Sequence, residues 1–187
     1  MSYMFYNARS FNQPVNFNTS NVIDMREMFC GAKSFNQPLN FDTSNVTKMD
    51  WMFRNARVFN QELNCDTSKV TNMEHMFSNA IKFNQPLNFD TSKVTNMDFM
   101  FSRAINFNQA LNFDTSNVTN MEYMFDEALA FENKYNSGKP LPNKIEDIKE
   151  WFNLNRDKMN MTDVKDKHGT EIDNFFSKIN NINSLNI

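Results

Sequence analysis

The sequence repeats itself with a period of 24 residues, and this period constrains the fold more than any other feature. One phenylalanine recurs at this interval without insertion or deletion: Phe29, Phe53, Phe77, Phe101 and Phe125. A unit this short cannot bury its own apolar side chains, so each copy must stack on the next to form a continuous core. The period therefore predicts a solenoid of about five to six stacked coils over residues 1–131.

One half of each unit alternates apolar and polar residues, a pattern typical of a short strand. In the unit that starts at Phe83, residues 86–90 place Leu87 and Phe89 on one side of the chain. Equivalent pairs recur in the other units: Val15 and Phe17, Leu39 and Phe41, Leu63 and Cys65, and Leu111 and Phe113. With neighbouring strands about 4.8 Å apart, the alternation predicts a parallel sheet along one face.

The other half of each unit spaces its apolar residues as a helix does. A stripe of about three helical turns is formed by Val94, Met97, Met100, Phe101 and Ala104. Thr95 and Asp98 have the spacing of a capping box, in which hydroxyl and carboxylate each satisfy a free backbone donor at a helix start. Together the two halves predict an α/β solenoid with one short parallel strand and one short helix in each coil.

The composition argues against several kinds of partner. At a formal net charge of −3 the chain lacks the basic excess of a nucleic-acid-binding protein, so we expect no nucleic-acid partner. No apolar run is long enough to span a bilayer, and we find no signal peptide or lipobox. Cys30 and Cys65 occupy different repeat positions, so we expect free thiols rather than a disulfide.

No pattern in the sequence indicates catalysis. His75 and His168 stand apart from any nucleophile or metal-ligand spacing, and there is no glycine-rich phosphate-binding loop. At helical spacing the methionines are expected in the core rather than in a soft-metal site. We therefore expect no enzymatic activity, no cofactor and no catalytic or metal-binding residues.

The outward positions of the strand-like segment form polar columns, and these supply the candidate binding residues. Repeat proteins use ordered faces of this kind for recognition, and amides offer both donors and acceptors. The candidates are Asn16, Asn40, Asn64, Asn88 and Asn112 in one column, and Asp42, Asp66, Asp90 and Asp114 in the next. A flanking column contains Pro14, Pro38, Glu62, Pro86 and Ala110.

Structural alternatives stay open for these columns. Stacked amides can bond to one another as ladders, and Asp with the following Thr-Ser can serve a turn. The aspartates could also bind a cation, but Lys69 and Lys93 lie nearby and Ca²⁺ sites gather about six to eight oxygens in one loop. Another column is expected to be buried and to satisfy backbone groups where the chain turns: Asn12, Asn36, Asn60, Asn84 and Asn108, each followed by a glutamine.

The period ends near Phe131, and residues 132–187 are expected to form a helical cap and tail. Residues 137–142 contain Gly and Pro and indicate a linker. Two apolar helical stripes follow: Ile145, Ile148 and Phe152, then Ile172, Phe175, Phe176 and Ile179. This segment either covers the open end of the last coil or acts as a partner-binding helical hairpin.

The consensus F-N-Q-P-L-N-F-D-T-S-N-V-T-N-M-x-x-M-F resembles the mycoplasma-type surface-lipoprotein repeat of uncharacterised function. Its apolar spacing, F-x3-L-x-F-x4-V-x2-M-x2-M-F-x2-A, is similar to that of the BspA-like leucine-rich repeats. The resemblance covers about residues 1–131. It implies a leucine-rich-repeat-like solenoid, an AT-rich genome and a surface or secreted protein involved in adhesion and protein binding.

From the residues and the resemblance we expect a non-catalytic protein–protein interaction or structural repeat module. The alternatives are a cell-surface adhesin-type protein and a virion or assembly component. A protein partner is expected, but the sequence does not identify it. Because the first coil has no cap, end-to-end self-association is a further expectation. The location stays open, since the resemblance implies a cell surface or virion while the chain lacks an export signal.

Overall fold

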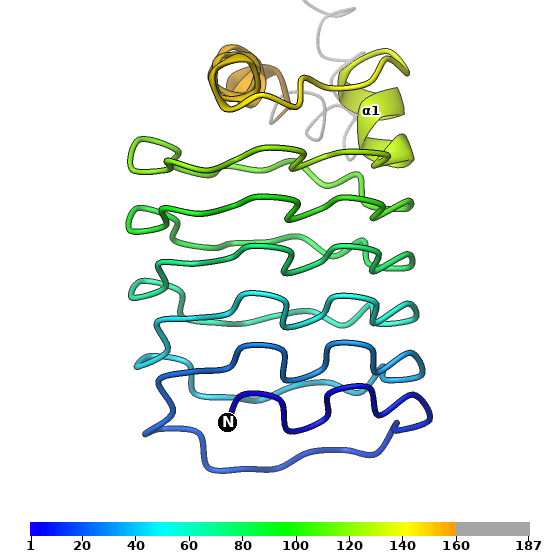
Figure 1. Cartoon of the computed structure of the whole chain (residues 1–187), viewed down its shortest axis with the longest axis vertical. Helices are drawn as coiled ribbons and strands as arrows, with labels where there is room; N and C mark the ends of the chain where they lie inside the picture. Colours follow the sequence, from blue (N-terminus) through cyan, green and yellow to red (C-terminus); the bar gives the residue numbers. More distant parts are fainter. Residues whose placement is uncertain (160–187) are drawn as a thin grey trace, which may run out of the picture.

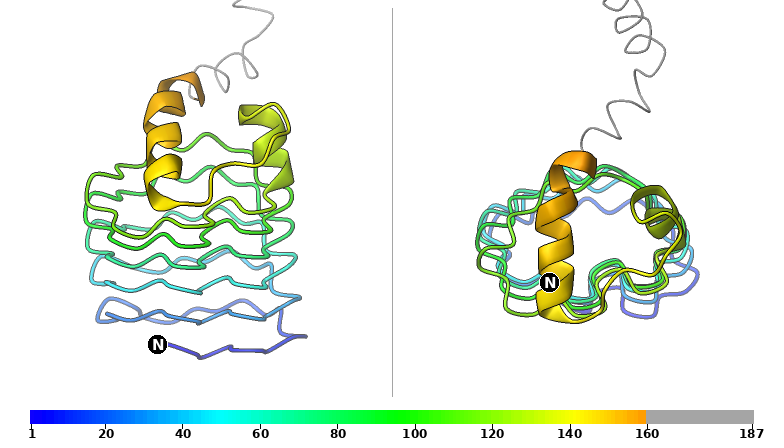
Figure 2. Two further views of the ribbon diagram at one scale, coloured as in Figure 1. Left: turned by 45° about the horizontal axis from the view of Figure 1, so that its top comes forward. Right: turned by 90° about the horizontal axis from the view of Figure 1, so that it is seen from above.

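The computed structural model describes residues 1–159 of the 187-residue chain. The chain winds into a stack of flattened coils that rise along one axis (Figure 1). Each coil runs out along one side of the stack and returns along the other, and seen from above the coils follow nearly the same outline (Figure 2). The outgoing run contains the M-x-x-M-F segment, and the return run contains F-N-Q-P-L-N-F.

The predicted strand and helix of each coil are both wrong, and with them the leucine-rich-repeat-like α/β solenoid. Within residues 1–159 there is no strand of a sheet, and the two helices lie near the C-terminal end of that range: α1 (Leu129–Tyr135) and a helix over residues 145–159. In place of a parallel sheet, the structure has four isolated parallel bridges. These are Asp24–Lys48, Lys48–Asn72, Asn72–Asn96 and Asn96–Asn120.

The return run forms no sheet, because side chains rather than backbone groups connect neighbouring coils on that side. The rings of Phe59 and Phe83, one coil apart, stack with centroids 6.0 Å apart. No backbone-to-backbone hydrogen bond joins residues 84–90 to a neighbouring coil. Side chains fill the space instead: the Asn84 backbone N–H donates to Asn60 Oδ1 over 2.8 Å.

The outgoing run forms consecutive tight turns rather than a helix. The N–H groups of Met100, Ser102 and Ala104 donate to carbonyls three residues earlier. The N–H groups that alternate with these donate to carbonyls of the next coil. Phe99 donates to Glu122 over 2.9 Å, and Phe101 donates to Met124 over 2.8 Å. An α-helix would need every N–H for its own i→i−4 bonds, so it cannot also supply these contacts between coils.

The predicted capping box is absent for the same reason. The Thr95 hydroxyl donates to the Thr71 carbonyl of the preceding coil over 3.2 Å, and the Asp98 N–H donates to Asn96 Oδ1 over 3.0 Å. Both groups therefore connect coils or close turns, and neither starts a helix.

The core is a continuous stack of phenylalanine rings. Phe101 lies between Phe77 and Phe125, with centroids 5.6 and 5.7 Å away and rings within 8° of parallel. It also stacks on Phe107 of its own coil at 4.2 Å. The equivalent residues of the other inner coils repeat this arrangement and are fully buried, together with the methionines beside them. Each coil thus completes the core of its neighbour.

The C-terminal part of the described chain lies across the end of the stack (Figure 2). Ile148 and Phe152 of the 145–159 helix are fully buried, and the Lys149 ammonium donates to the Val118 carbonyl over 2.7 Å. No helix within residues 1–159 is long and apolar enough to cross a membrane. The predicted stripe from Ile172 to Ile179 lies outside the described residues, so the domain boundary at 131/132 and the 132–187 cap stay predictions.

Candidate functional site

The asparagine column lies on the return side of the stack, and all its members are exposed: Asn16, Asn40, Asn64, Asn88 and Asn112. The alternation that the sequence predicts survives here although no sheet forms. Asn88, for example, stands between Leu87 and Phe89, which are 6% and 7% exposed. Packing of the two inward side chains therefore presents the amide between them to solvent.

The amides of this column have no hydrogen-bond partner among residues 1–159. The alternative that they bond to one another as a ladder is therefore wrong for this column. The ladder forms instead four positions earlier in each unit, where Asn36 Oδ1 accepts from the Asn60 N–H over 2.9 Å and Asn60 Oδ1 accepts from the Asn84 N–H. As predicted, that second column satisfies backbone groups, whereas the exposed column does not. The expectation that the second column is buried is wrong, because Asn12 is exposed and its other members are half-buried.

The predicted aspartate column is committed to turns. Asp42 Oδ1 accepts from the Ser44 hydroxyl and N–H over 2.6 and 3.0 Å, and Asp114 makes the same two bonds with Ser116. These bonds hold the pKa of both carboxyl groups below its usual range. The turn alternative therefore describes Asp42, Asp66, Asp90 and Asp114, which each accept from the serine two residues later.

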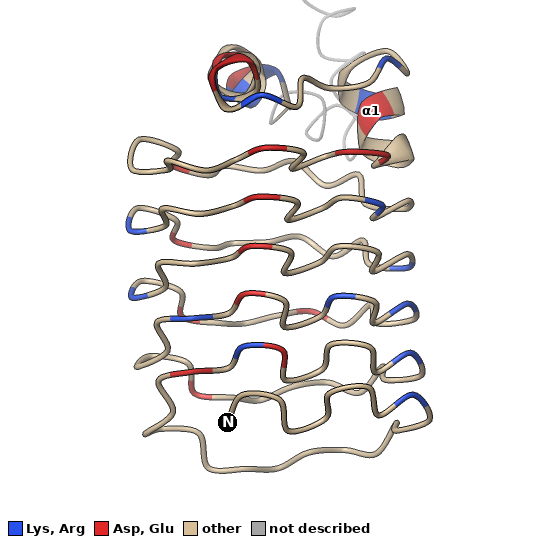
Figure 3. Cartoon of the chain, in the orientation of Figure 1, with Lys and Arg blue, Asp and Glu red and all other residues tan. Residues whose placement is uncertain are grey.

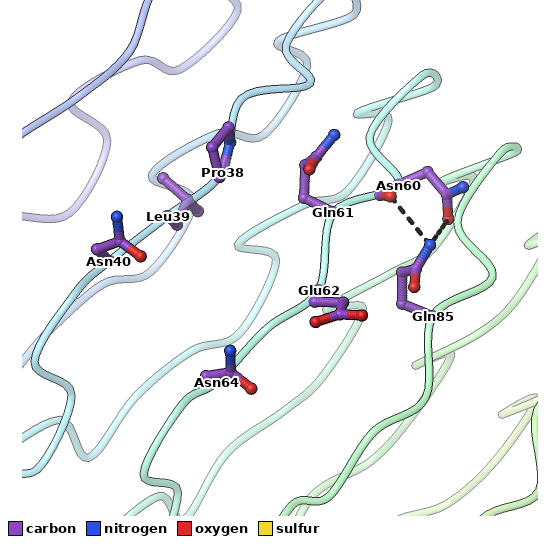
Figure 4. A pocket seen from close by; sticks show the side chains of 8 residues that line it. All are labelled: Pro38, Leu39, Asn40, Asn60, Gln61, Glu62, Asn64 and Gln85. Atoms are coloured by element: carbon purple, nitrogen blue, oxygen red, sulfur yellow. Dashed lines mark hydrogen bonds between the residues drawn. The ribbon is translucent and has the colours of Figure 1, made fainter.

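A shallow depression of about 370 Å³ opens beside the middle of the asparagine column. Figure 4 shows Asn40 and Asn64 on successive coils with the Glu62 carboxylate beside them, while Gln85 bonds back to Asn60. Glu62 is exposed and forms no hydrogen bond or ion pair with a described residue. The lining is Pro38, Leu39, Asn40, Asn60, Gln61, Glu62, Asn64 and Gln85.

Glu62 belongs with the candidate binding residues, although the sequence alone did not single it out. The signal was present, because Pro14, Pro38 and Pro86 occupy the same position in other units. A carboxylate at a position that is otherwise proline or, at Ala110, alanine places one charge beside the uniform asparagine column.

The remaining titratable groups form no recognisable reactive centre in the described part of the chain. His75 lies between Trp51 and Phe99, with ring centroids 4.4 and 4.6 Å away. Burial, together with the Arg54 guanidinium, lowers its pKa to about 4. Cys30 and Cys65 are free thiols, and burial raises the pKa of Cys65 to about 11. Among residues 1–159, no three His, Cys, Asp or Glu side chains are grouped so that they could hold a metal ion.

Chemically, the return side therefore offers a row of neutral donors and acceptors with one carboxylate beside it. The side chains are held in register by the core below them and need break no internal bond to accept a partner. This arrangement suits hydrogen bonding to a polar surface.

A family described as "Mycoplasma protein of unknown function, DUF285" matches residues 1–65 and 63–166. The match confirms the mycoplasma-type repeat and does not extend to the BspA-like leucine-rich repeats. Neither the curated proteins nor the solved structures contain a match to the chain.

Proposed function

The chain belongs to this mycoplasma protein family of unknown function, DUF285, and we propose that it is a non-catalytic binding module whose asparagine column recognises a protein partner. One observation supports the proposal above others. The repeat contains two long asparagine columns: the amides of one are bonded between coils, whereas those of the other are exposed and unbonded. Stability of the stack accounts for the first column and leaves the second without a structural role.

Recognition through this face would rest on many modest contacts. An exposed amide that exchanges water for a partner's polar group gains about 0.5–1.5 kcal/mol, so affinity must come from several asparagines acting together. The regular column aligns them with an extended partner. Glu62 adds a charge-assisted contact, which is about twice as strong as a neutral one, and fixes where along the column the partner binds.

The test is a comparison of two asparagine variants. In the first, Asn40, Asn64 and Asn88 are all replaced by Ala. The control replaces Asn21 and Asn106, which are exposed asparagines outside the column. Each immobilised protein is incubated with protein extracted from the source cells, and captured proteins are quantified by mass spectrometry.

We expect at least one captured protein to decrease tenfold or more with the column variant and to be unchanged with the control. Melting temperatures of both variants should stay close to that of the wild type, because none of the replaced amides in the column bonds to the fold. If capture is the same for wild type and column variant, or falls equally with the control, the asparagine column is not the binding face.

A further inference from the structure

A second concave site lies on the outgoing side of the stack, away from the asparagine column. It is a groove of about 320 Å³ that runs along the stack, across several coils. Its floor follows one repeat position, occupied in successive coils by Arg54, Ser78, Ser102 and Asp126. The two serines are small, and this leaves room between the side chains on either side.

The floor of the groove carries unused hydrogen-bonding groups. Ser78 and Ser102 line the groove, and neither hydroxyl bonds to a described residue. Neither oxygen is among the buried atoms that lack a partner, so both hydroxyls reach the surface of the groove. Two hydroxyls one coil apart therefore offer donors and acceptors to a ligand.

The N-terminal end of the groove carries an uncompensated positive charge. The Arg54 guanidinium lies over the Trp51 ring, with Cζ 4.5 Å from the ring centroid, and pairs with no carboxylate among residues 1–159. Its Nε is buried without a hydrogen-bond partner. Stacking on the indole holds the guanidinium in place, and the Cys30 thiol, which interacts with it, is neutral, so the positive charge stays without a counter-charge.

The opposite end carries a negative charge. The Asp126 side chain is half-buried and forms no hydrogen bond or ion pair with a described residue. Nearby Arg103 does not neutralise it, because Arg103 is paired with Glu127 at the rim over 3.1 Å. The groove therefore has an unpaired cation at one end and an unpaired carboxylate at the other.

The walls suit a polypeptide between these charges. On one side are the rings of His75 and Phe99, against which apolar side chains can pack. On the other, the Asn79 amide donates to Asn55 Oδ1 over 2.6 Å. This single bond leaves Asn55 a donor and Asn79 an acceptor for a peptide backbone.

The separation of the two charges sets the length of the ligand. Rings beside the groove are 4.6 and 5.0 Å apart from coil to coil, so three coil spacings place Arg54 and Asp126 roughly 14 Å apart. An extended peptide advances about 3.3–3.6 Å per residue, so about four residues span this distance. We propose that the groove binds an extended peptide of about four residues with its carboxylate at Arg54 and its cationic group at Asp126.

The surrounding charges support this orientation. The residue before each wall aromatic is acidic, and these residues form a row along the stack (Figure 3): Asp50, Glu74, Asp98 and Glu122. They disfavour an anionic group anywhere along the groove except at Arg54.

Three synthetic peptides test the proposal by titration calorimetry against the full chain. They are tetra-alanine with free termini, tetra-alanine with acetylated and amidated termini, and acetyl-Lys-Ala-Ala-Glu-amide. Binding of the first shows that free peptide ends supply the charges, and binding of the third shows that side chains of a longer protein can supply them. The uncharged peptide is expected to bind at least tenfold more weakly than whichever charged peptide binds.

The matched variant is Arg54→Ser, which introduces the residue that the next two coils carry at this position. It should weaken the binding of the charged peptides at least tenfold, and Asp126→Ser should do the same. Arg57→Ala, an exposed arginine outside the groove, and the triple Ala variant of Asn40, Asn64 and Asn88 should leave binding unchanged. The proposal is overturned if no charged peptide binds at millimolar concentration, or if the folded Arg54→Ser protein binds them as the wild type does.

Discussion

The backbone N–H of Asn60 donates to the side-chain oxygen of Asn36, one coil earlier, over 2.9 Å. Asn60 in turn accepts from the Asn84 N–H and from Gln85 Nε2, over 2.8 and 3.2 Å. Through its backbone N–H and its side-chain oxygen, Asn60 thus joins three coils at a position where no backbone-to-backbone hydrogen bond connects them. Asn64, four residues later in the same coil, forms no bond to the described chain.

Replacing these two asparagines by Ala should have very different effects. Asn60→Ala leaves the Asn84 N–H without its acceptor and should lower the free energy of unfolding by about 1–3 kcal/mol. Asn64→Ala should change it by less than about 0.5 kcal/mol. Urea denaturation followed by circular dichroism measures both. Equal effects would contradict the assignment of one column to the stack and the other to recognition.

Phe101 and Phe99 provide a second comparison, two residues apart. Phe101 is fully buried and stacks on three rings, so Phe101→Ala should be destabilising by about 3–5 kcal/mol. Phe99 is only half-buried at the groove wall, and Phe99→Ala should have no more than half that effect. The same denaturation experiment decides the order, and a larger effect at Phe99 would show that the ring stack is not the main core.

Replacing a buried threonine should have a different effect on stability in the first coil than in an inner coil. The Thr91 hydroxyl donates to the Asp114 carbonyl over 3.0 Å, whereas the buried Thr19 hydroxyl has no partner among residues 1–159. Thr91→Val should be destabilising by about 1 kcal/mol, and Thr19→Val should be neutral or stabilising. Thermal unfolding of the two variants in parallel tests this, and a destabilised Thr19→Val protein would contradict it.

His75 should make the stability depend on pH. Burial lowers its pKa in the folded protein to about 4, against about 6.5 in an unfolded chain. Between these values the unfolded state binds more protons, so the stabilising contribution is complete above about pH 6.5 and is lost as the pH falls towards 4.

The variant His75→Phe, which introduces the residue of the next coil at this position, removes the titrating group. The melting temperature of the wild type should fall more steeply than that of the variant between pH 7 and pH 5. Parallel curves over this range would show that His75 does not titrate abnormally.

Much of the candidate surface could be predicted from the sequence, because alternation indicates the inward and outward positions of the inner coils. In the first coil it is wrong for Phe17, which was expected to point inward and is 41% exposed. Leu87 and Phe89 are buried and Asn88 is exposed, as the pattern indicates. The role of the Asn60 column in satisfying backbone groups was also predicted, but the sequence left open whether the Asn64 column forms a ladder of its own. Only the hydrogen bonds of the folded chain show that the Asn60 amide reaches a neighbouring backbone while the Asn64 amide bonds to no described residue. The groove was not predicted from the sequence, because its two charged residues, Arg54 and Asp126, lie three repeat units apart. Each is the only residue of its kind at this repeat position.

The sequence by itself determined the 24-residue unit and which side chains enter the core, because periodic apolar residues have to be buried whatever the backbone does. It did not determine the backbone conformation. The spacing of Met97, Met100, Phe101 and Ala104 fits a helix, and it fits equally a series of tight turns that turns the same residues inward. Tertiary structure decided between them: alternate N–H groups of the outgoing run are bonded to the next coil, and on the return run side-chain amides such as that of Asn60 replace backbone bonds between coils, so no sheet forms.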